Sequence, residues 1–428
     1  MGSTSIPLRV AGPALAGLLL GGCGLAALSD LWFGEVEGPP LPGDRIAVML
    51  QADQLESDAS IAGMEIRLPP PVRNGAWPQD GGYPDHAMHH LAVGDNPEKV
   101  WEATVGDGAG WAARLTAQPI VFGGRVFTMD AVSQVSAFDM KTGKRLWETD
   151  VLEDDEEGAF GGGLAYFDGR IFVATGFAQV VALAAESGEV LWRTKLAGPL
   201  RSAPTVTGGR VFAVSIDNQL HALAVDDGQK LWTHAGITET AGLLGGASPA
   251  VAGDVVVVPY SSGELIALRV ENGRVIWSDT LATIRRAEAV STLADIRGKP
   301  VIDRGRVFAI SHSGRMVSID LRTGGRAWDR KVGGVNTPWV AGDFIYVLSN
   351  DSQLVCLTRS AGRVRWITQL PRYVDPESTA NPIAWTGPVL ASDRLIVSGS
   401  HGEVIAVSPY SGEVIGIIEM DSGVTVPP

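Results

Sequence analysis

Cysteine is almost missing from this chain. Its 428 residues include only Cys23 and Cys356, which lie 333 positions apart. Two distant thiols cannot form a disulfide framework or a cysteine-rich zinc site. Cys356 occupies a small apolar position of a repeat described below, and packing alone explains it.

Positive charge is also scarce. The 34 Lys and Arg residues are outnumbered by 48 Asp and Glu, which gives a formal net charge of −14, and no basic stripe interrupts the acidic background. Binding to nucleic acid needs clustered Lys and Arg to neutralise phosphates. The composition therefore excludes nucleic acid as the natural partner.

The familiar motifs of catalysis and cofactor binding are missing as well. The sequence has no G-x-x-x-x-G-K-[ST], no G-x-S-x-G, no H-E-x-x-H and no EF-hand loop. His86, His89 and His90 cluster in "DHAMHH" without a carboxylate or cysteine at ligand spacing, and the acidic run 152–158 is typical of a solvated loop. We therefore predict no catalytic residue, no metal site and no cofactor.

Long hydrophobic runs are absent too. The uncharged segment 10–20 has 11 residues, which is too short to span a bilayer and suits a secretory signal. Leu20-Gly21-Gly22-Cys23 resembles a bacterial lipobox, which predicts cleavage before Cys23 and its acylation; the alternative is an uncleaved membrane anchor. Residues 24–95 are rich in Pro and Gly. We predict a signal peptide at 1–22, a lipidated tether and extended arm at 23–95, and one domain at 96–428.

What the chain has in abundance is a repeat. Seven segments begin with a small residue, place a glycine six positions later, and six of them place a tryptophan four positions further on. The glycine can close a tight hairpin, and the small residue leaves room for an indole ring. We predict that the tryptophans wedge between neighbouring sheets; they are Trp147, Trp192, Trp232, Trp277, Trp328 and Trp366, with Gly416 in the seventh place.

Two more strand-like runs precede each segment, so that each repeat unit has four strands. Four-stranded units whose glycines recur every 38 to 51 residues predict an all-β fold, a β-propeller. The units are 115–151, 164–196, 200–236, 243–281, 297–332, 335–370 and 383–420. A lone strand at 99–105 and "GVTVPP" at 423–428 resemble parts of an eighth unit. We therefore expect this chain to be a member of an eight-bladed family whose C-terminus is truncated. The alternative is a seven-bladed ring with a spare strand.

The small-x5-Gly-x3-Trp signature resembles the repeat of pyrroloquinoline-quinone-type propellers. Together with the lipobox, it resembles the BamB family of outer-membrane assembly lipoproteins from Cys23 to the C-terminus. That resemblance implies a non-catalytic scaffold at the periplasmic face of the outer membrane. Its partners would be the POTRA domains of BamA, other BAM subunits and unfolded outer-membrane proteins, with the membrane reached through the lipid anchor.

Two other functions stay open. A quinone-dependent periplasmic oxidoreductase would share the repeat, but quinoprotein dehydrogenases resembling this chain carry an adjacent cysteine pair, and here both cysteines are solitary. An extracellular adhesion or sensor propeller is the third reading.

The resemblance also places a partner-binding rim. In the family, an L-S-L-R-G loop and a D-V-D loop contact BamA; here "AGLLGGASP" (241–249) and "ADIRGKP" (294–300) occupy the matching places. Leu244 stands where the family has arginine, and Arg297 where it has the second aspartate. The second loop lies within 283–305, the longest excursion between units, and long loops on rigid rings often carry function. The alternative is that both loops are ordinary connections between blades. The predicted partner-binding residues are Leu243, Leu244, Arg285, Arg286, Asp295 and Arg297.

Overall fold

A computed structural model describes residues 55–95, 97–108, 115–152, 162–239, 241–282 and 293–427. Residues 55–428 form one compact unit. The described part of this unit consists of strands and their connections, with one turn of 3-10 helix, η1 (Ala59–Ile61). None of the helical structure in these ranges is long and apolar enough to cross a membrane.

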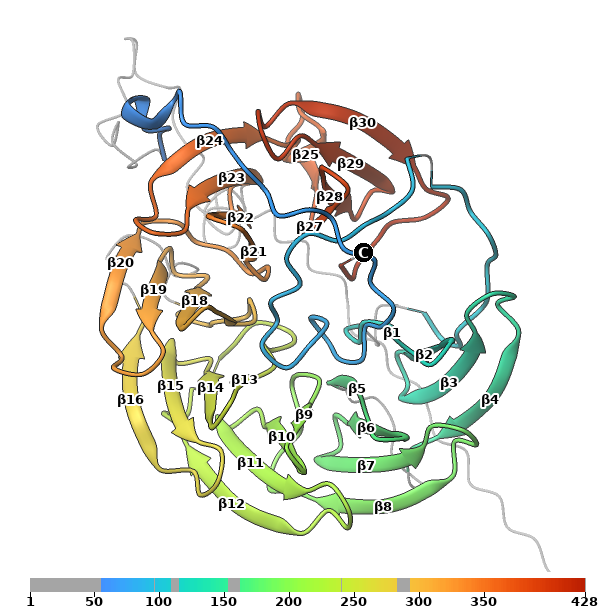
Figure 1. The fold of residues 1–428 in the computed structure, drawn as a ribbon. Helices are drawn as coiled ribbons and strands as arrows, with labels where there is room; N and C mark the ends of the chain where they lie inside the picture. Colours follow the sequence, from blue (N-terminus) through green and yellow to red (C-terminus); the bar gives the residue numbers. More distant parts are fainter. Residues whose placement is uncertain are drawn as a thin grey trace, which may run out of the picture. The chain divides into compact units, whose positions relative to one another are not determined.

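Seven sheets of four antiparallel strands follow one another around a ring (Figure 1). In each sheet, called a blade below, the strands pair in sequence order from the centre of the ring outward. The predicted β-propeller with seven complete units is confirmed. The blades are: blade 1, β1 (Ile120–Phe122), β2 (Arg125–Met129), β3 (Gln134–Asp139) and β4 (Arg145–Asp150); blade 2, β5 (Gly163–Phe167), β6 (Arg170–Ala174), β7 (Gln179–Ala184) and β8 (Val190–Lys195); blade 3, β9 (Thr205–Thr207), β10 (Arg210–Val214), β11 (Gln219–Ala224) and β12 (Lys230–Ala235); blade 4, β13 (Ala250–Ala252), β14 (Val255–Pro259), β15 (Glu264–Arg269) and β16 (Val275–Thr280); blade 5, β17 (Val301–Asp303), β18 (Arg306–Ile310), β19 (Met316–Asp320) and β20 (Arg326–Arg330); blade 6, β21 (Trp339–Ala341), β22 (Phe344–Leu348), β23 (Gln353–Thr358) and β24 (Val364–Gln369); blade 7, β27 (Trp385–Ala391), β28 (Arg394–Gly399), β29 (Glu403–Val407) and β30 (Val414–Glu419).

The repeat has a direct meaning inside each blade. Its small residue and its tryptophan are cross-strand partners, as in Ala267 and Trp277 of blade 4, and a register shift follows the small residue in every blade. A bulge of this kind twists the outer strand locally. The alanine leaves the space above the sheet that the indole needs.

Each repeat tryptophan also joins its blade to the next one. The Trp277 indole N–H of blade 4 donates to the carbonyl of Leu321 in blade 5 at 2.7 Å, and its ring lies over Gly324. A Cβ on Gly324 would lie 2.6 Å from Trp277, so only glycine fits there. The same bond joins the other pairs: Trp147 to Ala185, Trp192 to Val225, Trp232 to Val270, Trp328 to Arg359 and Trp366 to Pro409.

The predicted strand at 99–105 is wrong, because this segment has no hydrogen-bonded neighbour strand among the described residues. Trp101 nevertheless docks like a repeat tryptophan. Its indole donates to the carbonyl of Met140 at 2.9 Å and covers Gly143 of blade 1. At the other side of blade 7, all six residues of β30 are exposed.

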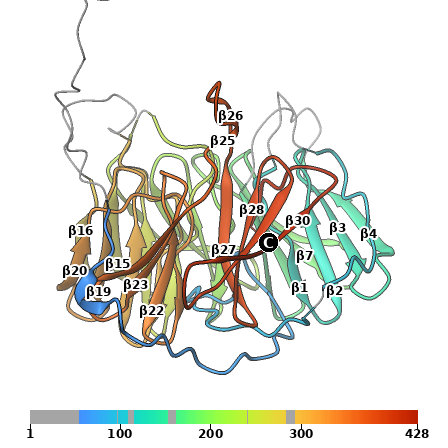
Figure 2. The same cartoon turned by 90° about the horizontal axis from the view of Figure 1, so that it is seen from above.

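Residues 72–92 form an irregular segment with a tight turn between Gln79 and Gly82; this segment, called the arm below, crosses one face of the ring (Figure 2). It meets the innermost strand of every blade in order. The hydrogen bonds are Trp77 with Val121, Tyr166 N–H to Pro78, Gln79 with Val206, Val251 N–H to Pro84, Ile302 N–H to Asp85, the Trp339 indole to His89 and Leu91 N–H to Leu390. The arm therefore covers the centre of the ring on this face.

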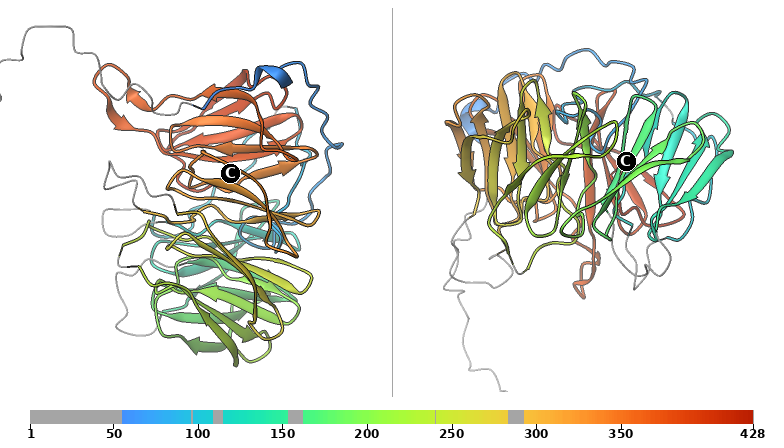
Figure 3. Two further views of the ribbon diagram at one scale, coloured as in Figure 1. Left: turned by 90° about the vertical axis from the view of Figure 1, so that its left-hand side faces the viewer. Right: turned by 90° about the horizontal axis from the view of Figure 1, so that it is seen from below.

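One element was not predicted from the sequence. Strands β25 (Tyr373–Asp375) and β26 (Ala380–Pro382) form a two-stranded hairpin between blades 6 and 7. The hairpin projects from the face opposite the arm (Figures 2 and 3). It consists mostly of exposed residues and is not part of a blade.

Candidate functional site

The loop between β12 and β13 forms part of the ring face opposite the arm. Leu243 is half-buried in this loop, whereas the Leu244 side chain is 48% exposed. Glycines flank both leucines, and Gly245 adopts a φ of +80°, which favours glycine. The loop therefore presents an apolar side chain on a backbone that other residues must hold in place.

Arg201, on the connection between β8 and β9, does much of that holding. Its guanidinium donates to the carbonyls of Leu243 at 2.6 Å and Gly245 at 2.8 Å, and to the Asp295 carboxylate at 2.9 Å. Both charged side chains are nearly buried. Sequence reasoning missed Arg201; the only available signal was that it is the one charged residue between Lys195 and Arg210.

Asp295 binds the loop from the other side. The N–H of Leu243 donates to its carboxylate at 2.9 Å, and Asp295 is only 2% exposed. A buried carboxylate with these partners fixes the shape of the loop and does not reach the surface. Its place in the predicted rim is therefore that of a positioning residue.

Arg297 completes the group. Its Nε donates to the carbonyl of Leu244 at 3.0 Å. Burial lowers the pKa of its guanidinium, as does the charge of Arg201, while the Asp295 carboxylate opposes the shift. The structure thus brings four of the predicted rim residues together: Leu243, Leu244, Asp295 and Arg297. Arg285, Arg286 and Cys23, the predicted lipidation residue, lie outside the described residues.

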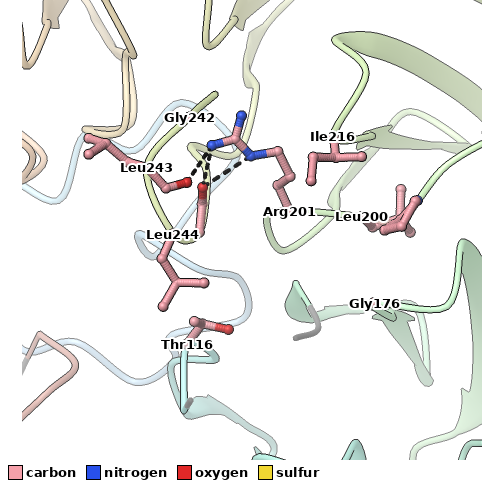
Figure 4. A pocket seen from close by; sticks show the side chains of 10 residues that line it. Thr116, Gly176, Leu200, Arg201, Ile216, Gly242, Leu243 and Leu244 are labelled. Atoms are coloured by element: carbon pink, nitrogen blue, oxygen red, sulfur yellow. Dashed lines mark hydrogen bonds between the residues drawn. The ribbon is translucent and has the colours of Figure 1, made fainter. Parts of the chain in front are cut away.

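Two hollows adjoin the loop. The larger, about 420 Å³, is mainly apolar and includes Leu200, Ile216 and Leu244 in its wall (Figure 4). The smaller, about 90 Å³, is polar, and its lining includes residues on or just before the innermost strand of each of the seven blades. It therefore lies at the centre of the ring. Asp80 of the arm and residues 425–427 of this chain complete the lining. Arg201 and Gly245 line both hollows.

The arm provides a charged wall of the central hollow. Lys299 forms an ion pair of 2.8 Å with Asp80 of the arm, and both side chains are largely buried. Behind them, His86 is buried and its Nδ1–H donates to the carbonyl of Pro300 at 2.8 Å. In the ranges that the structure describes, no three His, Cys, Asp or Glu side chains are grouped to hold a metal ion.

Burial lowers the pKa of His86 to about 4, and the charge of Lys299 adds to the shift, while the hydrogen bond to Pro300 and the Asp80 charge oppose it. The unfolded chain takes up this proton near pH 6.5, and the folded protein only near pH 4. Stability should therefore fall as the pH drops from 6.5 to 4, by about 3 kcal/mol in total. His86→Asn, which tolerates the φ of +59°, should flatten that fall in urea unfolding at several pH values. His89→Asn, at a φ of +55° on a half-exposed side chain, is the control, and equal slopes for both variants would contradict the assignment.

Comparison with known proteins agrees with this architecture. The family model described as "Outer membrane protein assembly factor BamB" matches residues 90–157 and 131–368. The protein of that name from Yersinia pestis is 30% identical over 334 residues, which are 76% of this chain and 82% of that protein. The chain belongs to the BamB family.

Solved structures show the same fold. BamB from Moraxella catarrhalis superposes with a TM-score of 0.64 at 19% identity, covering 72% of this chain and 89% of that one. A europium-containing methanol dehydrogenase gives a TM-score of 0.65 at 15% identity, covering 82% and 87%. At such identities the likeness concerns the fold alone. The ring is shared between a BamB and an enzyme, so function must be argued from the site.

Proposed function

We propose that this protein is a non-catalytic scaffold of the outer-membrane β-barrel assembly machinery, which binds the POTRA domains of BamA and aids insertion of outer-membrane proteins. The curated relative from Yersinia pestis is named as an assembly factor. The observation that carries the proposal is the braced loop: Leu244 is exposed beside an apolar hollow, while Arg201 and Asp295 hold the backbone of the preceding residue, Leu243. An exposed apolar anchor on a rigid loop suits partner binding.

The partner-facing rim consists of Leu243, Leu244 and Arg297, with Asp295 supporting it from inside, and we extend the proposal to Arg285 and Arg286. Leu244→Arg or Arg297→Glu should reduce recovery of BamA in co-purification at least tenfold, since a buried interface anchor is worth about 2 kcal/mol or more. Arg274→Glu is the matched control, because Arg274 is exposed on the hairpin between β15 and β16 of blade 4. Unchanged recovery with both rim variants would show that BamA binds elsewhere.

We also propose that acylated Cys23 anchors the protein at the periplasmic face of the outer membrane. Several acyl chains hold a protein firmly, whereas one chain binds only marginally. Cys23→Ser should move the protein from the outer-membrane fraction to the soluble periplasmic fraction, as judged by immunoblotting of fractionated cells. Retention of the variant in the membrane would favour an uncleaved anchor instead.

A quinone-dependent oxidoreductase is less well supported. The polar hollow at the ring centre holds about 90 Å³, while sites for small molecules and cofactors are usually about 300–1,000 Å³. Arg201, Lys299 and Asp80 occupy the surrounding space with their own ion pairs. The residues at the ring centre do not fit a tricyclic quinone.

A further inference from the structure

Arg297 keeps hydrogen-bonding capacity that the loop does not use. Its Nε donates to the Leu244 carbonyl, but among the described residues its two outer nitrogens donate to no acceptor. The group is half-buried, and burial lowers its pKa. A desolvated guanidinium without a carboxylate is stabilised by an anion that offers two oxygens in its plane.

The neighbouring charges are already matched to each other. Arg201 is paired with Asp295 and Lys299 with Asp80. Among the described residues around the central hollow, this leaves Arg297 as the cation without a carboxylate within 4 Å. The local excess of positive charge stands out in a protein of net charge −14. Charge complementarity therefore asks for a single carboxylate at this point.

The apolar hollow lies next to the same guanidinium. Leu244 and Gly245 lie between the Arg297 guanidinium and this hollow. The Leu244 carbonyl accepts a hydrogen bond from Arg297, and both residues line the 420 Å³ hollow. Ile216, which is 53% exposed, and buried Leu200 continue the apolar lining. A ligand that binds Arg297 through a carboxylate and fills the apolar hollow would therefore carry its apolar group within about one residue of that carboxylate.

We propose that this rim captures the C-terminal end of a protein chain, with the terminal carboxylate on Arg297 and the last, apolar side chain in the hollow. A chain end fits better than an acidic side chain of an internal segment. On the arm side, the paired Asp80 and Lys299 line the central hollow, and residues 425–427 of this chain line it as well. With a volume of about 90 Å³, the hollow has room for a terminal carboxylate but not for a segment that continues through the ring. This inference rests on the proposed partner-facing rim and names the kind of segment that the rim takes.

The test is peptide binding to the full chain, followed by fluorescence anisotropy. Eight-residue peptides share a labelled Gly-Ser body and end in Phe, either as the free acid or as the amide. The acid should bind at least tenfold more tightly, because a charge-assisted hydrogen-bonded pair is lost in the amide. A free-acid peptide ending in Ser should bind about tenfold more weakly than the Phe peptide, since it leaves the apolar hollow empty.

Variants assign the selectivity to Arg297. Arg297→Gln should bring the acid down to the affinity of the amide, whereas Arg297→Lys should keep part of the preference, because lysine keeps the charge but loses the planar fork. Leu244→Asn should weaken acid and amide alike. Arg274→Gln is the control, and circular dichroism checks that each variant is folded.

Three results would overturn the inference: no binding of the Phe acid, equal binding of acid and amide, or a preference for the acid that survives Arg297→Gln. An amidated peptide with an internal Asp that binds as tightly as the free acid would point to an acidic segment instead. BamA co-purification with the same variants separates the two proposals. If the unmodified protein binds acid and amide equally while BamA recovery still falls in the rim variants, only the chain-end inference is refuted. If the unmodified protein prefers the acid but BamA recovery does not change in the rim variants, only the BamA rim is refuted.

Discussion

Trp277→Ala is expected to lower the free energy of unfolding by about 3–5 kcal/mol, the range found for large aromatic residues in cores. Trp277 is 7% exposed, and its indole both fills the space between blades 4 and 5 and bonds the Leu321 carbonyl. Trp277→Phe should lower the free energy of unfolding by less, because it keeps much of the aromatic volume. The remaining loss comes from the Leu321 carbonyl, which no longer has its donor. Urea unfolding followed by far-ultraviolet circular dichroism measures both, without relying on tryptophan fluorescence.

A pair of glycines in blade 5 provides the control from the other side of the contact. Gly324 and Gly305 have φ angles of +75° and +74°, so alanine is similarly strained at both. Only at Gly324 would the new Cβ meet the Trp277 ring, since nothing lies within 4 Å of a Cβ at Gly305. Gly305→Ala should cost about 1–2 kcal/mol from backbone strain, and Gly324→Ala about 1–3 kcal/mol more from overpacking. Equal losses would mean that the indole does not hold the blades together.

Asp295→Ala should be comparably severe. It leaves the nearly buried Arg201 guanidinium without its carboxylate, and breaking a buried pair in this way costs about 3–5 kcal/mol. The Leu243 N–H loses its acceptor as well. The same variant should weaken BamA co-purification although Asp295 is not at the surface, because the loop that carries Leu244 loses its support.

A double variant distinguishes the stability cost of an unpaired buried charge from the loss of the loop conformation that BamA recognises. Arg201→Met with Asp295→Leu removes both charges and keeps apolar volume, so much of the lost stability should return. The loop carbonyls of Leu243 and Gly245 would still lack their donor. We therefore expect restored stability without restored BamA recovery. Recovery of both would mean that the ion pair does not shape the rim.

The ring could be predicted because its rules are local. The spacing of Ala267, Gly273 and Trp277 is set by one hairpin, and it fixes both the turn and the cross-strand partner. The prediction of a strand at 99–105 was wrong for the opposite reason. Trp101 packs on blade 1 as the repeat tryptophans pack on their neighbours, but a strand also needs a hydrogen-bonded neighbour strand. The sequence of one segment does not show whether such a neighbour is present.

The site depends on contacts between distant parts of the chain. Arg201 and Asp295 are 94 residues apart, and no periodicity links them. Leu243, Leu244, Asp295 and Arg297 were placed together only through the family resemblance. The division of labour among them, with Asp295 inside and Leu244 outside, follows from burial and could not be derived from the sequence. Polar pairs of this kind are chosen by tertiary geometry.

The arm has a consequence for the order of events during biogenesis. Its residues leave the ribosome before any blade, yet Leu91 binds Leu390, about 300 positions later in the chain. Closing so long a loop is entropically costly until the intervening units have folded and brought the ends together. The arm is thus synthesised before the blades but binds to the ring after them, and its full set of hydrogen bonds can form only when all seven sheets are in place.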